Sequence, residues 1–551
     1  MATLSASAAV YPAKAHAARI AKTLGAKSGL ILLAGRPSLM YDDSDMPVIY
    51  RQRRYFFYLT GVEDADCYAT YDISRSHLTL WVPDQRTQRE ILYMGPVITP
   101  EKATKTYDID EAQYAHDLDE FLIGWLKAKK SVFLLHSHLD EVPNRARNEI
   151  AWGMVEGPGS VDVDRLLPAM NACRAIKDKW EIAAIRKANE ITATAHVQVL
   201  KHIRAIDSEA AVEGIFVGTC RAGGAKNQAY LPICAAGTNA ATLHYVKNDE
   251  AIKGEIFLMD AGCEWSNYAC DVTRTFPISL KDGGWPSEES KNIYSLVKEM
   301  QDTCIANMKP GVLFRDLNVL AHHIMVRGLL KLGIYHNGTV KEIIQNGTSA
   351  AFLPHGIGHH LGLEVHDVEH PDIPITSGDS AARRMRPFGL LKRIEGRGRT
   401  TFADNFIAIY GMEADEFDLV YGRLIHNTTQ HGKLCTSTVG LQENMVVTME
   451  PGIYFNKFGL DEIYLPNPEH SKYINTKVLD RYRPVGGVRI EDDILITAKY
   501  NENLTMTPKG DEALKIINDG PRSQWELPKQ ASINDIVDPF SALATLLGTM
   551  F

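Results

Sequence analysis

The sequence predicts a two-domain α/β (α+β) protein, with a mixed α/β domain followed by a larger domain of strands and helices. A chain of 551 residues is too long for a single hydrophobic core. Hydrophobic residues make up 45% and charged residues 23%, which is typical of a globular protein. Short apolar runs alternate with helix-period patterns along most of the chain.

The first 160 residues mix expected helices and strands. Residues 11–25, YPAKAHAARIAKTLG, predict a helix that begins after Pro12. Its apolar stripe comprises Ala13, Ala17, Ile20, Ala21 and Leu24. Two further strands and two further helices are expected at residues 28–35 and 77–84, and at residues 117–128 and 147–154.

A long amphipathic helix marks the start of the second domain. Its apolar positions recur at helical spacing and comprise Ile182, Ile185, Ala188, Ile191 and Ala195. We therefore expect an N-terminal domain over 1–170, a second domain over 171–515 and a C-terminal tail over 516–551. Within the second domain, helices are expected at residues 293–308 and 314–333 between strand-rich segments.

Residues 381–440 do not fit the pattern of a compact domain. They begin with a basic cluster and continue into an acidic segment at 412–422. A structureless loop of this length is uncommon within a domain. We interpret the segment as an atypical surface insertion, and a translated intron is the alternative that the residues leave open.

Composition excludes several partners. The net charge is −9, from 59 basic and 68 acidic residues, which argues against nucleic acid and anionic membrane. No apolar run approaches the ~20 residues needed to span a bilayer, and no secretory apolar region is seen. The eight cysteines form no CxxC pair, which predicts free thiols in a reducing compartment. We expect a cytoplasmic protein.

Two aspartates are expected side by side in a β-hairpin. The strand Ile256–Met259 ends at Asp260, a turn-prone stretch follows at 263–268, and alternation resumes from Asp271. Two adjacent buried carboxylates repel each other unless a cation lies between them.

Two glutamates also occur in apolar strands. Glu450 ends a strand before a Pro-Gly turn, and Glu491 follows Ile490 in another strand. Acidic residues are rarely buried unless they are paired or bind a metal. Asp492 and Asp493 follow directly and could be exposed, so spacing alone does not select Glu491.

Four histidines occur in HGIGHHLGLEVHD, residues 355–367. The pair His355 and His359 has the spacing of an HExxH zinc helix, but its glycines and missing glutamate disfavour that interpretation. The alternation that follows indicates extended chain. In extended chain, residues 355 and 359 share a face and His360 points away from it.

These residue types together indicate metal-assisted hydrolysis. Four carboxylates and one neutral imidazole carry a charge of −4, which two divalent cations balance. Oxygen-rich sets with one nitrogen suit manganese or cobalt better than structural zinc. Two such ions can activate water near neutral pH and polarise a carbonyl, and we expect this carbonyl to be that of an amide.

The motifs, in their order, resemble the pita-bread metallopeptidases, which include methionine aminopeptidase, prolidase and Xaa-Pro aminopeptidase. The resemblance covers about residues 175–510 and rests on LHYV, DAGCEWSNYACDVTRTFP, HGIGHHLGLEVHD, MEPGIYF and GGVRIEDDILIT. It implies two metal ions, for which manganese is expected. The ligands that it implies are Asp260, Asp271, His359, Glu450 and Glu491.

The same resemblance implies roles for further residues. His244 is expected to contact substrate near the scissile bond, and His355 and His366 to stabilise the tetrahedral intermediate and bind substrate. Arg489 is expected to orient Glu491, and Glu450 to shuttle a proton. His360 is interpreted as structural.

The N-terminal domain resembles that of creatinase and aminopeptidase P, through RYFFYLTGVEDADCYATYD at residues 54–72. Methionine aminopeptidases lack this domain, so the resemblance favours the proline-specific branch and, through residues 470–493, its fungal-type Xaa-Pro aminopeptidases. It implies proline-containing peptides as substrates and a homo-oligomer, a dimer or tetramer.

The expected activity is release of the N-terminal residue from peptides with proline second. Two alternatives are a prolidase limited to Xaa-Pro dipeptides and an inactive pita-bread module that binds peptides or proteins. The retained set of metal ligands argues against the second alternative.

Overall fold

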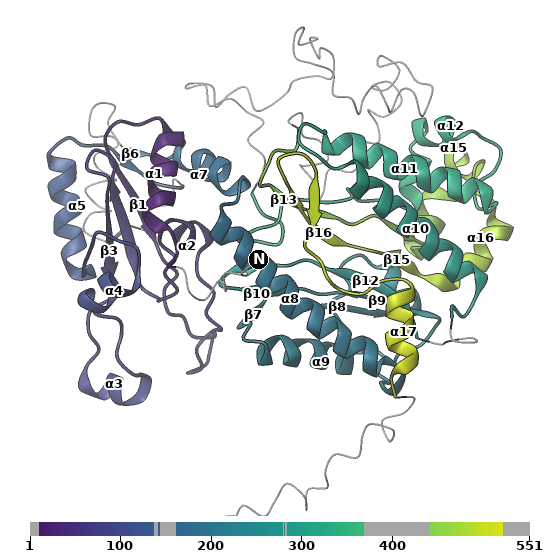
Figure 1. Ribbon diagram of the computed structural model, residues 1–551, viewed down its shortest axis with the longest axis horizontal. Helices are drawn as coiled ribbons and strands as arrows, with labels where there is room; N and C mark the ends of the chain where they lie inside the picture. Colours follow the sequence, from purple (N-terminus) through teal and green to yellow (C-terminus); the bar gives the residue numbers. More distant parts are fainter. Residues whose placement is uncertain are drawn as a thin grey trace, which may run out of the picture.

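The computed structural model describes residues 10–136, 142–143, 161–278, 280, 284–368 and 440–521. These residues form two α/β units that lie side by side, as the sequence predicts (Figure 1). The helix expected at 147–154 lies outside the described residues, as do nearly all of the expected insertion and most of the expected tail. The predicted domain boundaries remain predictions.

The N-terminal unit is built on one six-stranded mixed sheet with the order β4-β3-β2-β1-β5-β6. Its β1–β2 and β2–β3 pairs are antiparallel, whereas the outer pairs are parallel. The strands are β1 Leu30–Ala34, β2 Tyr68–Asp72, β3 His77–Val82, β4 Glu111–Tyr114, β5 Val132–Phe133 and β6 Val161–Asp162. The helices are α1 Ala13–Leu24, α2 Arg54–Thr60, α3 Gln88–Met94, α4 Pro100–Thr106, α5 Leu118–Lys127 and α7 Leu166–Ala175.

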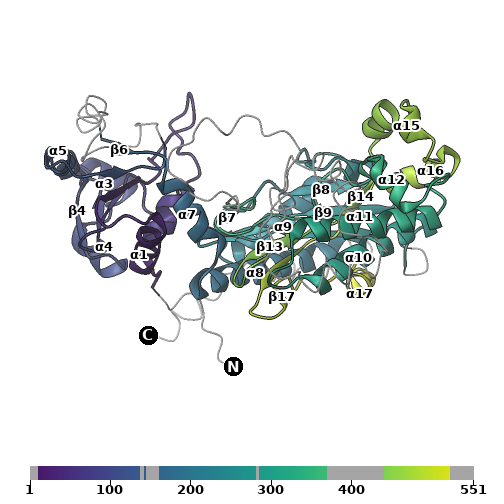
Figure 2. The ribbon, with the colours of Figure 1, turned by 90° about the horizontal axis from the view of Figure 1, so that it is seen from above.

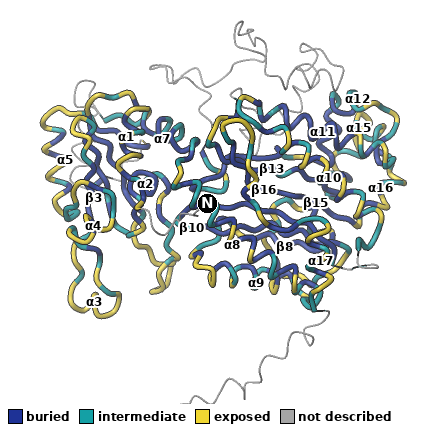
Figure 3. Tube along the Cα trace, in the orientation of Figure 1, coloured by how far each residue is buried: buried dark blue, intermediate teal, exposed yellow. Residues whose placement is uncertain are grey.

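Helix α1 confirms the predicted apolar stripe, because all five of its predicted core residues are buried. Gly25 ends the helix in the left-handed conformation, at φ 69°, which glycine adopts without strain. The strands at the centre of both units are buried, whereas helix α3 is exposed (Figure 3).

The second unit consists of two helix pairs, each packed on short antiparallel sheets (Figures 1 and 2). Helices α8 Lys179–His202 and α9 Glu209–Ala222 share a core with β9 and β12. Helices α10 Glu288–Asn307 and α11 Phe314–Lys331 share a core with β13 and β16. The remaining helices are α12 Val340–Gln345, α15 Pro468–Ser471, α16 Thr476–Tyr482 and α17 Asp511–Asp519.

The sheets of this unit are small and antiparallel. Their orders are β12-β9-β8, β13-β16-β17, β14-β15 and β11-β10-β7. The strands are β7 Asn227–Gln228, β8 Ile233–Ala236, β9 Ile256–Asp260, β10 Cys263–Trp265, β11 Tyr268–Ala269, β12 Thr273–Pro277, β13 Val446–Met449, β14 Gly452–Tyr454, β15 Gly487–Arg489, β16 Asp492–Ile496 and β17 Asn501–Asn503.

Two local expectations differ from the structure. The stretch expected as a turn at 263–268 is largely a second hairpin, β10–β11, whose turn residues Ser266 and Asn267 have positive φ. The strand expected through Glu491 is interrupted there, because β15 pairs with β14 while β16 pairs with β13. Glu491 therefore lies at the point where the chain passes from one sheet to the next.

Candidate metal centre

A cavity of about 330 Å³ lies where several strands of the second unit end. All of the predicted site residues line it, although they come from segments far apart in the sequence. They are His244, Asp260, Asp271, His355, His359, His366, Glu450, Arg489 and Glu491. His360 does not line it, in agreement with its predicted orientation.

Asp260 and Asp271 lie together, as the hairpin pattern predicts. Asp260 ends β9 and pairs with Thr273 of β12, two residues beyond Asp271. The Tyr230 hydroxyl lies 2.6 Å from Oδ1 of each aspartate. Burial raises the pKa of Asp260, although Arg489 opposes this with Nη2 placed 2.7 Å from Asp260 Oδ2. The two carboxylates are thus held close together in a buried site.

His359 faces these carboxylates. Its Nε2 lies 3.4 Å from Asp271 Oδ2 and 3.5 Å from Glu450 Oε1, while Nδ1 lies 3.1 Å from the His360 carbonyl oxygen. Burial disfavours the imidazolium, but the hydrogen bond and charge of Asp271 and the charge of Glu450 outweigh it and raise the His359 pKa to about 9. The same pairing holds the pKa of Asp271 below its usual range despite burial.

Glycine allows the histidine segment to approach β13. A β-carbon at Gly358 would lie 2.3 Å from the Thr448 carbonyl oxygen, so any other residue would push the two segments apart. The close approach lets the His359 N–H donate to Thr448 Oγ1 at 3.1 Å, and the Thr448 N–H donate to the His359 carbonyl at 2.9 Å. Gly358, one of the glycines that disfavour a zinc helix, therefore lets His359 lie beside β13.

Glu491 has a buried carboxylate oxygen without a protein partner. Its Oε2 accepts a hydrogen bond from Thr273 Oγ1 at 2.7 Å, but no described residue bonds Oε1. Burial, together with the charges of Asp271 and Glu450, raises the pKa of Glu491 well above its usual value. Burial likewise raises the pKa of Glu450 to about 7.

The donor set fits divalent metal ions. Asp271, His359 and Glu491 each offer a ligand atom, and these atoms lie within 4.8 Å of one another. A cation in this position would satisfy the free Glu491 oxygen and relieve the repulsion between the carboxylates.

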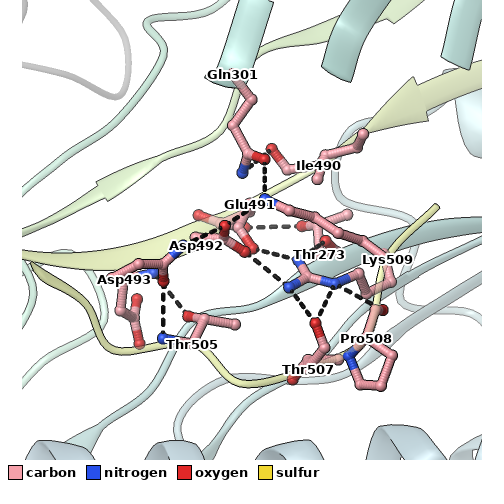
Figure 4. A network of polar contacts seen from close by, with 12 residues as sticks. Thr273, Gln301, Ile490, Glu491, Asp492, Asp493, Thr505, Thr507, Pro508 and Lys509 are labelled. Carbon is pink, nitrogen blue, oxygen red and sulfur yellow. Dashed lines mark hydrogen bonds and ion pairs between the residues drawn. The ribbon is translucent and has the colours of Figure 1, made fainter. Parts of the chain in front are cut away.

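A buried polar network lies next to the site (Figure 4). The sequence patterns did not predict this network. Asp492 and Asp493 are both fully buried, so the expectation that they could be exposed is wrong. Asp492 lies 2.7 Å from the Arg274 guanidinium and 2.6 Å from Lys509 Nζ. Arg274 Nη1 also donates to the Glu491 carbonyl oxygen at 2.7 Å, which fixes the backbone of that residue.

Asp493 supports the other side of the site. Its Oδ2 accepts from Asn189 Nδ2 at 2.8 Å and from the Asp271 N–H at 3.2 Å. Three consecutive acidic residues therefore have three different environments. The sequence pattern could not predict these environments, because the partners come from distant segments.

The remaining histidines also line the cavity. His355 Nε2 lies 2.8 Å from the Tyr454 hydroxyl, which accepts from Arg489 Nη1 at 2.9 Å. The His366 ring lies 4.4 Å from the His359 ring in an edge-to-face arrangement. His244 is exposed, as is His366, so both can meet a substrate.

Tyr230 and Tyr454 were not singled out by the sequence. Each lies beside apolar residues, where a tyrosine is normally part of the core. Their hydroxyl groups instead face the aspartates and Arg489.

The chain matches two known domain families. The model of metallopeptidase family M24 matches residues 183–389 and 404–498, which is more than half of the chain. The chain belongs to this family. The model of the aminopeptidase P N-terminal domain matches residues 13–133. The predicted order of a creatinase-type N-terminal domain and a pita-bread metallopeptidase domain is confirmed.

Several M24 relatives are similar over nearly the whole chain. A probable Xaa-Pro aminopeptidase of Pyrenophora tritici-repentis is 44% identical, over 93% of this chain and 72% of that protein. A probable Xaa-Pro aminopeptidase of Aspergillus clavatus is 44% identical, over 93% of each protein. These relatives confirm the predicted resemblance to fungal Xaa-Pro aminopeptidases and the metallopeptidase class.

Solved structures show the same fold. Aminopeptidase P from E. coli, with the inhibitor Pro-Leu, has a TM-score of 0.68 at 25% identity, over 93% of this chain and 99% of that chain. Aminopeptidase PepP of Pseudomonas aeruginosa has a TM-score of 0.68 at 27% identity, over 92% and 98%.

Two other expectations can be compared with the described residues. No helix among them is both long enough and apolar enough to cross a membrane. Seven of the eight cysteines are described, and each is a buried free thiol, as predicted. The eighth, at position 435, lies outside the described residues, as does the basic cluster of the expected insertion.

Proposed function

We propose that this M24 chain releases the N-terminal residue from peptides whose second residue is proline. The resemblance to Xaa-Pro aminopeptidases over nearly all of the chain supports this activity. Metal dependence is supported above all by one observation: Glu491 Oε1 is buried and has no hydrogen-bond partner among the described residues. A buried carboxylate oxygen without a partner is costly, and a bound cation would satisfy it.

In this proposal, two divalent ions are held by Asp260, Asp271, His359, Glu450 and Glu491. When bound, the ions supply activated water and a Lewis acid for the scissile carbonyl. Manganese suits a site of four carboxylates and one imidazole. The five ligands would hold the ions within the cavity, and the other lining residues would be available to bind substrate.

The other residues bind substrate and move protons. Glu450 would accept a proton from the attacking water and pass it to the leaving amine, the role that the family resemblance implies. His355 and His366 stabilise the developing negative charge, and the exposed His244 contacts the peptide near the bond that is cleaved. Arg489, held by Asp260 and the Tyr454 hydroxyl, orients the ligands rather than the substrate.

We further propose a homo-oligomer, a dimer or tetramer, located in the cytoplasm. The seven described thiols are free, as expected in a reducing compartment. The mass of the native protein by light scattering tests the oligomer.

A cleavage assay with two substrates tests the activity. Purified protein, stripped with EDTA and reloaded with manganese, is given an Xaa-Pro dipeptide and an Xaa-Pro-Xaa tripeptide. We expect release of the first residue from the tripeptide. Cleavage of the dipeptide alone would make the chain a prolidase. No bound metal and no cleavage of either peptide would instead indicate an inactive binding module.

A further inference from the structure

One arginine of the N-terminal unit bonds three side chains of the catalytic unit. Arg54, the first residue of α2, is only 7% exposed. Its Nη1 donates to Asn267 Oδ1 at 2.7 Å and its Nη2 to Glu264 Oε2 at 2.5 Å. Its Nε donates to Glu364 Oε1 at 2.8 Å. All three nitrogens of the guanidinium are therefore used across the contact between the units.

These partners belong to two of the segments that carry residues of the candidate site. Glu264 and Asn267 lie in the β10–β11 hairpin, which joins Asp260 to Asp271. Glu364 lies in the segment that runs from His359 to His366. The Ala269 N–H donates to the Gly362 carbonyl at 2.8 Å and links the two segments directly.

Two further sets of ion pairs hold the segment that carries His366, one on each side of that residue. Arg51 makes two bonds of 3.1 Å to the Glu364 carboxylate, and its Nε donates to Glu264 at 2.8 Å. On the other side of His366, Asp367 accepts from Arg174 at 2.5 Å and lies 3.3 Å from Lys177 Nζ. His366 is thus held between two ion pairs, although its own ring is exposed.

We propose that Arg54 is a positioning residue of the active site, through which the N-terminal domain fixes the β10–β11 hairpin and the segment that carries His366. The guanidinium is a planar fork whose bonds to several partners fix their relative positions. A misplacement of about 1 Å in a catalytic group can lower a rate about hundredfold. The inference rests on the proposed roles of His366 and the aspartates.

Hydrogen–deuterium exchange of the full-length protein measures positioning without substrate. We expect Arg54→Met to accelerate exchange in peptides that cover residues 263–269 and 361–367 by about tenfold, and Arg54→Lys to do so less, because lysine keeps the charge but loses the fork. The matched control is Arg19→Met. Arg19 bonds the Ile176 carbonyl at 3.2 Å, the Tyr58 hydroxyl, and Glu181 at 3.5 Å, and it makes no direct hydrogen bond to either segment.

The expected pattern is faster exchange in both segments for the Arg54 variants and not for the Arg19 variant. Unchanged exchange in the Arg54→Met protein would overturn the proposal. So would equal acceleration in the Arg19→Met protein, since the effect would then follow from a looser contact between domains.

A double-variant cycle tests whether Arg54 acts through His366. We expect Arg54→Met to lower kcat about tenfold to hundredfold with little change in KM, and to have little further effect in a His366→Ala background. Independent, multiplying losses would contradict action through His366. If manganese-loaded protein cleaves no proline peptide at all, the proposed function fails, while the exchange measurement still decides the role of Arg54.

Discussion

The Tyr230 hydroxyl lies 2.6 Å from Asp271 Oδ1, and it is equally close to Asp260. One phenol group therefore bridges two candidate metal ligands. Such outer partners fix the orientation of ligands, and their loss commonly weakens metal binding about tenfold to hundredfold. We expect Tyr230→Phe to bind manganese more weakly by this factor, and to regain most of its activity when the metal is in excess.

Calorimetric titration of stripped protein with manganese measures this effect. Tyr335→Phe is the control, because Tyr335 is also a tyrosine within the fold, but its hydroxyl bonds only the Thr348 carbonyl, at 2.8 Å. Equal affinity in the Tyr230→Phe and wild-type proteins would contradict a role for the phenol in holding the ligands.

Glu491→Gln should abolish activity without destabilising the metal-free protein. The variant removes a buried carboxylate whose pKa is raised well above its usual value by burial and by neighbouring acids. We expect kcat to fall by about three orders of magnitude or more, because the metal-activated water is lost. Thermal unfolding in EDTA should occur at an equal or higher temperature than in wild type.

Added manganese separates the metal effect from folding. A ligand at about 100 times its Kd stabilises a protein by about 2.7 kcal/mol, and the Glu491→Gln protein should lose most of this gain. The exposed Glu469, which pairs with Lys472 at the surface, provides the control variant Glu469→Gln. A full manganese stabilisation of Glu491→Gln would exclude Glu491 as a ligand.

Metal affinity should increase with pH. In the metal-free protein the His359 pKa is raised to about 9 and that of Glu450 to about 7, so both hold protons near neutral pH. A metal requires the neutral imidazole and the ionised carboxylate, so binding must release protons. For each proton released, the apparent affinity should rise about tenfold per pH unit.

Titrations in buffers of different ionisation enthalpy count the released protons directly. We expect release of at least the protons held by His359 and Glu450 at pH 6.5, with a further contribution from Glu491, and fewer protons at pH 8.5. A constant affinity over this range would show that the ligands are already deprotonated.

Acid should destabilise the fold through buried neutral histidines. Burial lowers the pKa of His322 from 6.5 to about 3. The folded protein keeps His322 neutral, whereas the unfolded chain binds a proton below pH 6.5. The contribution of neutral His322 to the free energy of unfolding is therefore fully present above pH 6.5. It decreases by about 1.4 kcal/mol per pH unit as the pH falls toward 3.

The variant His322→Gln isolates this contribution from those of the buried acids. Relative to wild type, its free energy of unfolding in urea should improve steadily below pH 6.5. The control is His116→Gln, for which the pH dependence should have the opposite sign, because a hydrogen bond with Asp84 raises the pKa of His116. Relative to wild type, His116→Gln should lose stability as the pH falls. A pH-independent difference for His322→Gln would contradict the prediction.

Local patterns predicted those parts of the site that depend on single strands. The hairpin that pairs Asp260 with Thr273 follows from alternation and from an acidic residue at the end of an apolar run. Alternation could not choose among Glu491, Asp492 and Asp493, because all three are buried for different reasons. The choice of Glu491 came from the resemblance to known metallopeptidases.

Contacts between distant segments could not be predicted from pattern. Tyr230 lies in a sequence typical of a core, and Arg54 lies in one typical of a helix start. The partners of both residues are set only by the tertiary fold. Charge does not distinguish Arg54 either, because it is one of 59 basic residues in the chain. The geometry of the pair Thr273 and Glu491, 218 residues apart, likewise becomes visible only in the structure.

The late position of Glu491 in the chain has a consequence during synthesis. The residues of the β9–β12 hairpin are made early, whereas Glu491, which bonds Thr273 of that hairpin, is made more than 200 residues later. Contacts of such high sequence separation form late in folding. With Glu491 as a proposed metal ligand, we expect a chain that stops before residue 491 to lack peptidase activity.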